Sequence, residues 1–227
     1  MLFQDLPARL ADVRERIDAA RSRGGHGQSV TIVAVTKTYG ADAPMAAFAA
    51  GVKDVGENKV QEAVVKMQEV TVPLQWHLIG HLQRNKVKQL DGFHLVHSVD
   101  SARLADAVAS FGVSRRLDVD ALLQVNVSGE GSKGGFGPAE LEGESARLVG
   151  QSGLRVHGVM TMAPFDASEA VLRRVFSGAR EAAKVLRNAG HPATELSMGM
   201  SGDYEVAVEE GATLVRLGTV LFGARAG

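Results

Sequence analysis

Lys37 is the residue whose type and position most directly suggest covalent chemistry. It ends the apolar, β-branched run TIVAVTK, a composition typical of a buried strand. A lysine buried at such a position must be paired, deprotonated or joined to another group. Because desolvation favours the neutral form of an amine, such a lysine could act as a nucleophile toward a carbonyl compound. The alternative is a strand-terminal lysine whose charged head extends into solvent.

A second group of residues, near the C-terminus, is suited to an anion. Ser201 and Gly202 precede a predicted helix over 203–210, whose first N–H groups and dipole favour negative charge. Gly218 and Thr219 close the last apolar run, and a glycine lets a phosphate approach backbone N–H groups. In a barrel these two stretches are the loops after strands seven and eight, the recurrent phosphate site. Taken singly, Ser201 could be only a helix cap and Gly218 only a turn residue.

Arg216 lies inside the apolar stretch ATLVRLGTV. Because a guanidinium keeps its charge, a buried one requires either an anionic or polar ligand or a carboxylate partner. Glu57, near the end of a predicted strand, is the structural alternative to a ligand.

The elements that must position these residues alternate between helical and strand-like segments. An amphipathic helix is predicted over 3–23, with Leu6, Leu10, Val13 and Ile17 at helical spacing and Gly24-Gly25 as its stop. Strands are predicted at 31–37, 52–57, 75–80, 93–99, 121–127, 154–160, 194–199 and 213–219, and helices at 42–50, 58–70, 84–90, 101–110, 138–150, 168–189 and 203–210. This alternation predicts parallel βαβ units, and eight strands predict an α/β fold of one (β/α)8 TIM barrel with an additional N-terminal helix. An open doubly wound sheet is the alternative.

Alternation of side chains within the runs favours the closed barrel. Trp76 and Leu78 take one face of their strand and His77 takes the other. The polar face contains, from several strands, Lys37, His77, Gln124, Asn126 and Arg216. A barrel turns one face of each strand toward its lumen and builds its sites at the carboxyl ends.

Composition excludes several classes of function. The 25 basic and 26 acidic residues nearly cancel, so no global field favours nucleic acid or an acidic membrane. Cysteine is absent, no apolar run is long enough to span a bilayer, and the histidines lack metal-ligand spacing. We therefore expect a cytoplasmic, metal-free single domain over 1–227, with a helix at 1–24 packing on a barrel at 31–227. We also expect a monomer.

Seven sequence blocks, in order, resemble the signature blocks of the pyridoxal phosphate homeostasis protein family, the YggS/PROSC group. They are AVTKTYG, GENKVQEAVVK, WHLIGHLQRNK, HSVDS, NVSGEGSKGGF, GVMTMAP and SMGMSGDYEVAVEEGATLVRLGTVLFG. The family is similar to the N-terminal barrel of bacterial alanine racemase and binds pyridoxal 5'-phosphate (PLP). Ordered blocks over most of the chain are far more specific than any single motif.

The resemblance implies a role for each matching residue. Lys37 would form a Schiff base with the PLP aldehyde, Ser201 and the backbone of Gly218 and Thr219 would bind the phosphate, and Arg216 would face the pyridine nitrogen. Asn58, His77, Met160 and Met200 lie in matching blocks and are expected to line the pocket. No catalytic residue is assigned, because an arginine at the ring nitrogen disfavours the pyridinium form and weakens the ring as an electron sink.

The expected function is PLP homeostasis, in which the protein holds the cofactor and supplies it to PLP-dependent apoenzymes. One alternative is a small PLP-dependent racemase or lyase with Lys37 as general acid and base. A second is a barrel enzyme that uses Lys37 as a Schiff-base nucleophile on phosphorylated sugars. Lys133, His81 (where many relatives have proline) and the basic residues of 83–88 stay without an assigned role.

Overall fold

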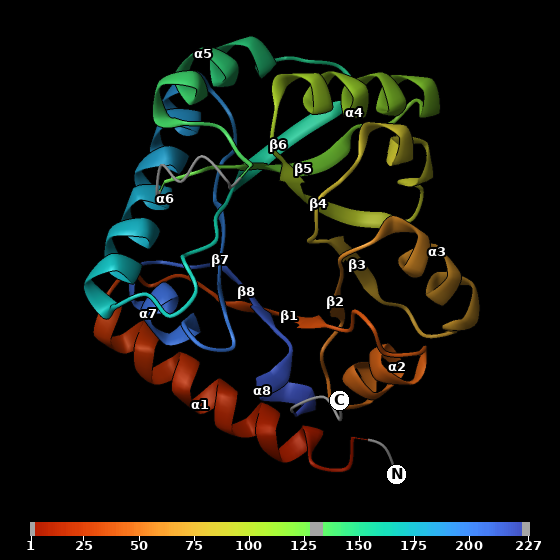
Figure 1. Ribbon diagram of the computed structural model, residues 1–227, viewed down its shortest axis with the longest axis vertical. Helices are drawn as coiled ribbons and strands as arrows, with labels where there is room; N and C mark the ends of the chain where they lie inside the picture. The colour runs from red at the N-terminus through yellow and green to blue at the C-terminus, as the bar shows by residue number, and fades with distance from the viewer. Residues whose placement is uncertain (1–2, 128–133, 224–227) are drawn as a thin grey trace.

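Eight parallel strands close into a barrel in the computed structural model, which describes residues 3–127 and 134–223 (Figure 1). The strands are β1 (Thr31–Val35), β2 (Asp54–Glu57), β3 (Gln75–Leu78), β4 (Phe93–Val99), β5 (Val119–Gln124), β6 (Leu154–Met160), β7 (Glu195–Met200) and β8 (Leu214–Leu217). They pair in sequence order, and β8 returns to β1 with Val33 opposite Arg216. The predicted TIM barrel is confirmed, and the open-sheet alternative is wrong.

Helices surround the barrel and connect its strands (Figure 1). They are α1 (Leu6–Gly24), α2 (Asp42–Ala49), α3 (Val60–Glu69), α4 (Ala102–Arg115), α5 (Pro138–Leu148), α6 (Glu169–Ala189), α7 (Tyr204–Glu209) and α8 (Thr219–Phe222). The predicted helix over 84–90 is instead a 3₁₀ helix, η1 (Arg84–Gln89). Its buried residue Val87 and the buried Leu90, which directly follows η1, are three apart, which is the spacing that a 3₁₀ helix aligns on one side. The short helix α8 was not predicted, because the last strand ends at Leu217, two residues earlier than expected.

The N-terminal helix α1 docks through the predicted apolar face and ends at the predicted glycines. Its buried residues are Leu6, Leu10, Val13, Ile17 and Ala20. Gly25 adopts a left-handed conformation (φ 68°) and its N–H bonds the carbonyl oxygen of Arg21 at 3.1 Å. Gly24 has a different role, because a Cβ there would overlap the backbone of Glu209 in α7. The pair therefore ends α1 and also lets it approach α7 closely.

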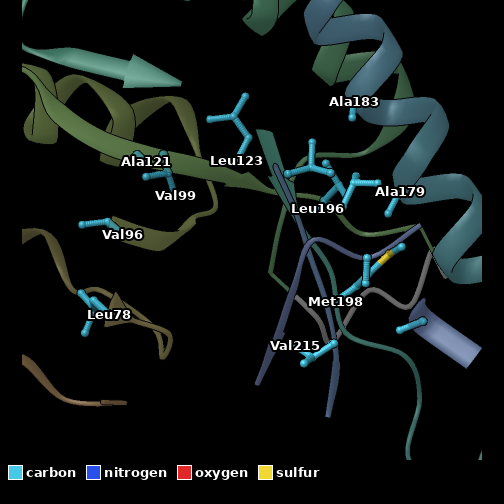
Figure 2. Close-up of a cluster of buried hydrophobic side chains, with 14 of the residues drawn as sticks. Leu78, Val96, Val99, Ala121, Leu123, Ala179, Ala183, Leu196, Met198 and Val215 are labelled. Atoms are coloured by element: carbon cyan, nitrogen blue, oxygen red, sulfur yellow. The ribbon is translucent and has the colours of Figure 1, made fainter. Parts of the chain in front are cut away.

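The hydrophobic core has two layers, as the side-chain alternation predicts. The outer layer fills the space between strands and helices, where Leu123 and Met198 of the sheet and Ala179 of α6 belong to one cluster (Figure 2). A separate inner cluster fills the lumen, with Val33, Leu95, Leu122, Met160 and Leu214. Because side chains fill both the space outside the sheet and the lumen, a site is expected at the mouth formed by the carboxyl ends of the strands.

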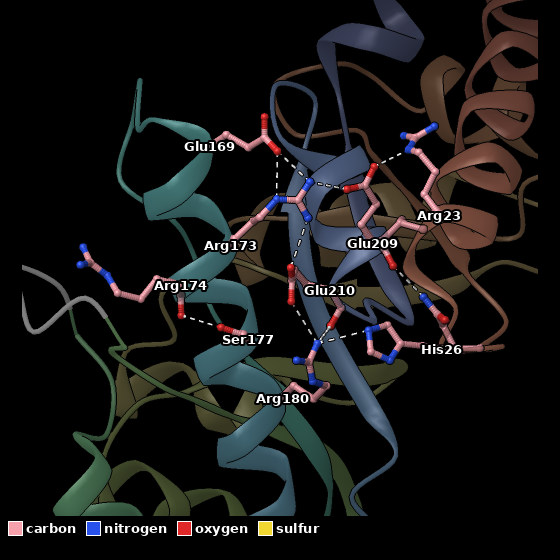
Figure 3. A network of polar contacts seen from close by, with 11 residues as sticks. Arg23, His26, Glu169, Arg173, Arg174, Ser177, Arg180, Glu209 and Glu210 are labelled. Atoms are coloured by element: carbon pink, nitrogen blue, oxygen red, sulfur yellow. Dashed lines mark hydrogen bonds and ion pairs between the residues drawn. The ribbon is translucent and has the colours of Figure 1, made fainter.

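Helices α1, α6 and α7 are also joined by a surface network of ion pairs (Figure 3). Arg173 of α6 contacts Glu169, Glu209 and Glu210, while Arg23 of α1 contacts Glu209. Exposed pairs contribute little individually, but shared partners reduce the conformational entropy that each contact costs. The network holds α7, whose preceding loop contains Ser201.

Candidate functional site

Lys37 lies in the turn that directly follows β1, at the carboxyl-end mouth of the barrel. The strand ends at Val35, earlier than predicted, and Thr38 adopts a left-handed conformation (φ 69°) that turns the chain away from the sheet. The side chain of Lys37 is half-buried, and in the described part of the chain no carboxylate lies within ion-pair distance of its amine. An amine with this exposure can be reached by a small molecule.

A second lysine close by, Lys66 of α3, is buried and forms an ion pair with a carboxylate. Its Nζ donates to Oε1 of Glu57 at 2.7 Å and to the carbonyl oxygen of Thr36 at 2.8 Å. The hydroxyl of Thr36 also donates to Oε1 of Glu57, at 2.6 Å. Because Thr36 immediately precedes Lys37, this buried pair fixes the backbone from which the Lys37 side chain extends.

Glu57 was the alternative carboxylate partner for Arg216, and this alternative is wrong. Glu57 shares the outward parity of Val55 in β2 and pairs with Lys66 between the sheet and α3. Arg216 instead donates through Nη1 to the hydroxyl of Ser197 at 2.6 Å and through Nη2 to the carbonyl oxygen of Thr161 at 2.9 Å. Among the residues that the structure describes, it has no carboxylate within ion-pair distance.

Arg216 is a buried cation whose hydrogen-bond partners, among residues 3–127 and 134–223, are neutral groups. Its residue is 4% exposed, and burial lowers its pKa to about 10, which leaves it protonated at neutral pH. Its register partners are Val33 of β1 and Met200 of β7, so it occupies the rim of the lumen between those strands. The unused N–H groups of its guanidinium can therefore serve a polar ligand.

The predicted anion site comes together from the loops after β7 and β8. The hydroxyl oxygen of Ser201 accepts from the N–H of Gly218 at 3.2 Å and from the N–H of Val220 at 3.3 Å. Thr219, between these two, is the first residue of α8. Asp203 closes the Ser201 loop by accepting the Met200 N–H at 2.6 Å. Backbone N–H groups that converge on one hydroxyl form a cradle suited to a phosphate.

Asp203 adds a negative charge close to this cradle. Burial raises the pKa of its carboxyl above the ordinary value, although the Met200 N–H and the charge of Arg216 oppose that shift. An anion bound at the cradle would oppose ionisation of Asp203 further.

The remaining predicted pocket residues take different positions. Asn58 is half-buried directly after β2, and its backbone lies so close to Gly80 that a Cβ on Gly80 would overlap the Asn58 carbonyl oxygen. Met160 is fully buried in the inner cluster, whereas Met200 is 39% exposed at the end of β7. Met160 thus forms part of the floor below the mouth, and Met200 part of its edge.

His77 lies deeper than a residue at the mouth. Its register partners are Gly56 and Leu95, and its two ring nitrogens contact His97 at 2.8 Å and Asp54 at 3.1 Å. Its side chain faces the lumen, as the alternation predicts, and both of its polar atoms are used inside the protein.

Sequence reasoning missed Ser197, His97 and Thr161, which support Arg216 from below. Ser197 could have been found, because it alternates with the outward-facing Leu196 and Met198 of β7. The contact between His97 Nδ1 and the Ser197 hydroxyl, at 2.8 Å, joins positions 100 residues apart, and no local pattern indicates it.

The three features without an assigned role are only partly placed. His81 is exposed and contacts Asp100 through Nδ1 at 3.1 Å. The basic residues of 83–88 belong largely to η1, whose Lys88 is exposed and whose Val87 is buried. Lys133 lies outside the described residues.

Comparison with known proteins shows similarity over nearly the whole chain. Residues 9–226 match the family described as alanine racemase, N-terminal domain. The pyridoxal phosphate homeostasis protein of Aquifex aeolicus is 39% identical over 221 residues, covering 96% of this chain and 97% of the relative. The protein of that name from Pseudomonas aeruginosa is 40% identical over 219 residues, covering 95% and 94%.

A solved structure is also similar to this chain in both fold and sequence. PipY of Synechococcus elongatus PCC7942, solved with PLP bound, has a TM-score of 0.85 and 36% identity, covering 96% of this chain and 100% of that chain. Similarity of this extent covers the mouth, the cradle and the lumen alike. The chain therefore belongs to the pyridoxal phosphate homeostasis protein family, within the broader group of alanine racemase N-terminal domains.

Proposed function

We propose that this protein binds PLP at the mouth of its barrel through Lys37, and that it serves PLP homeostasis rather than catalysis. The observation that carries the proposal is the arrangement of three groups around one mouth: a half-buried amine with no carboxylate partner in the described part of the chain, a buried guanidinium and a backbone N–H cradle. When bound, PLP supplies an aldehyde, an aromatic ring with a nitrogen acceptor and a phosphate. Relatives named for PLP homeostasis, and PipY solved with PLP bound, support the same ligand.

The residues present fit such a group. The cradle of Ser201, Gly218 and Val220 would hold the phosphate, since its donors and hydroxyl already converge within hydrogen-bond distance of one another. Lys37 would attach the aldehyde covalently. Arg216, charged at neutral pH, would donate to the ring nitrogen and keep it unprotonated. Asn58 and Met200 would border the ring.

The position of Arg216 also supports storage over carbanion chemistry. A cation at the ring nitrogen opposes its protonation, and an unprotonated ring withdraws electrons less strongly. Lys37 is then a tether rather than a catalytic base. We therefore infer that the protein acts as a carrier. We further propose that it is a monomer and that PLP-dependent apoenzymes receive the cofactor from it.

The decisive experiment is borohydride reduction of the PLP-loaded protein, followed by peptide mapping. We expect label on Lys37, loss of label in Lys37→Ala, and normal labelling in Lys59→Ala, which removes an exposed lysine after β2. Label on another lysine, or no label, would contradict the assignment. A colourless protein that PLP does not change would favour the phosphorylated-sugar alternative instead.

Two further measurements test the finer parts of the proposal. Turnover of L-amino acids above that of free PLP would favour the racemase or lyase alternative. Faster reactivation of a PLP-dependent apoenzyme by the loaded protein than by an equal concentration of free PLP would support delivery. Within residues 3–127 and 134–223, no helix is both long and apolar enough to cross a bilayer.

A further inference from the structure

A continuous chain of polar contacts crosses the lumen below Arg216. Nη1 of Arg216 lies 2.6 Å from the hydroxyl of Ser197, which lies 2.8 Å from Nδ1 of His97. Nε2 of His97 lies 2.8 Å from Nδ1 of His77, and Nε2 of His77 lies 3.1 Å from Oδ1 of Asp54. The chain uses four strands, β8, β7, β4 and β3, and ends on β2.

The two ends of this chain determine the direction of every hydrogen bond in it. Arg216 can only donate, so the Ser197 oxygen accepts and its proton is free to be donated to Nδ1 of His97. His97 then carries its proton on Nε2 and donates to Nδ1 of His77. His77 in turn carries its proton on Nε2 and donates to the Asp54 carboxylate, which can only accept. With both imidazoles neutral, every contact has one donor and one acceptor.

The opposite direction leaves a group unsatisfied. If Nδ1 of His97 carried the proton, both Arg216 and His97 would donate to Ser197, and the Ser197 proton would lose its acceptor. Ser197 and His97 are both 0% exposed, so an unmade hydrogen bond there is costly. Burial also holds the pKa of His97 well below its usual range, with smaller contributions from His77 and Arg216, which keeps His97 neutral.

We propose that Asp54, His77, His97 and Ser197 are positioning residues, which fix the guanidinium of Arg216 through a one-way hydrogen-bond chain anchored at the opposite pole of the barrel. The effect of this hydrogen-bond chain on PLP binding rests on the proposed function, whereas the hydrogen-bond chain itself does not. Asp54 is the first residue of β2, at the amino-terminal pole, and the cradle lies beyond the carboxyl ends of the strands. A change at Asp54 that leaves the backbone of β2 in place can therefore reach the cofactor site through the lumen.

The chain explains why a serine can orient an arginine. A lone hydroxyl rotates, but the Ser197 hydroxyl is held because its proton is committed to His97, so its lone pair faces Nη1 of Arg216. The Thr161 carbonyl oxygen fixes Nη2 independently. Two fixed contacts define the guanidinium plane, and its remaining N–H groups then point in a set direction.

The first test is nitrogen NMR of the histidine-labelled protein without cofactor, at neutral pH. We expect His77 and His97 to be neutral, with the proton on Nε2 and Nδ1 unprotonated. The two signals are assigned by their loss in His77→Gln and His97→Gln. A proton on Nδ1 of His97, or a charged imidazolium at His77, would overturn the proposal whether or not PLP binds.

The second test compares Asp54→Leu with Asp54→Asn. Asparagine keeps an oxygen that accepts from Nε2 of His77, whereas leucine does not. We expect Asp54→Leu to shift protons toward Nδ1 of both histidines and to weaken PLP binding about tenfold, the effect of one hydrogen bond to a charged group. Asp54→Asn should restore both properties to within about twofold.

The matched control is Asp120→Leu, which removes a carboxylate that contacts a different histidine, His157, at 2.6 Å. It should leave the His97 signal and PLP affinity unchanged. Circular dichroism shows whether each variant is folded, and Ser197→Ala provides a second variant that should weaken PLP binding. If Asp54→Leu is folded and leaves both the His97 proton and the affinity unchanged, the proposal is wrong. If the NMR result is as expected but no variant changes the affinity for PLP, the direction of the hydrogen bonds is supported and their positioning role at the cofactor site is wrong.

Discussion

Replacing Lys66 with methionine would remove the charge that neutralises Glu57. The Lys66 side chain is 8% exposed and that of Glu57 is 0% exposed, so the carboxylate would be left buried with only the Thr36 hydroxyl on Oε1. Its second oxygen, Oε2, already has no hydrogen-bond partner in the described structure. Breaking a buried pair in this way costs about 3–5 kcal/mol of unfolding free energy.

Urea unfolding of the cofactor-free protein measures this loss directly. The control is Lys59→Met on the same side of the barrel, because Lys59 pairs with Glu62 at 2.9 Å while its side chain is 71% exposed. An exposed pair contributes about 0–1 kcal/mol, so the two variants should differ several-fold. Adding Glu57→Gln to Lys66→Met removes the unpaired charge and should recover most of the loss.

The same variant tests whether the buried pair positions Lys37. Lys66 donates to the carbonyl oxygen of Thr36, so its loss frees the residue next to the amine. We expect weaker PLP binding in Lys66→Met even under conditions where it is fully folded. A stability loss no larger than that of Lys59→Met, together with unchanged PLP affinity, would refute the reasoning.

The other predictions concern the cradle and the surface. Ser201→Ala removes the acceptor of the Val220 N–H and should weaken PLP binding about tenfold by titration. Ser177→Ala should not, because the hydroxyl of this half-buried residue of α6 contacts only the carbonyl oxygen of Arg174 among the described residues. Because burial raises the pKa of Asp203, its stabilising contribution is present at low pH and is lost as pH rises through the folded-state pKa. Asp203→Asn, which keeps the acceptor, should therefore raise the unfolding free energy more at pH 7 than at pH 4; an equal change at both would contradict this. Arg173→Ala should lower the unfolding free energy by about 1 kcal/mol at low salt and by less at high salt.

The barrel and much of the site could be predicted because both depend on local patterns. Alternation within each run determines which side chains face the lumen, and Arg216 is easily recognised because it is a charged residue within an apolar run. Lys37 could be proposed for a similar reason, although its strand ends at Val35 and the amine lies in a turn. The error over Glu57 was avoidable, since Glu57 shares parity with Val55, which faces the helices.

The remainder could not be read from the sequence because it depends on contacts between distant strands. Lys66 resembles any helix-surface lysine, and only its three-residue spacing from Ala63 and Val60 indicates that it faces the sheet. Along the sheet, β4 and β7 are connected through β5 and β6, and the register shifts between β4 and β5 and between β5 and β6. Side-chain alternation within a single strand does not indicate such shifts between strands.

The three groups that would hold PLP are each positioned by a different layer of the fold. The outer layer fixes the residue before Lys37 through Glu57 and Lys66, and the lumen fixes Arg216 through Ser197. The surface network holds α7 and with it the loop of Ser201 (Figure 3). Because these supports share no residue, a change in one layer should move one contact and leave the others in place, so their effects on binding should add. Such a site can lose one contact and still hold the ligand through the other two, which agrees with the proposed role in PLP supply.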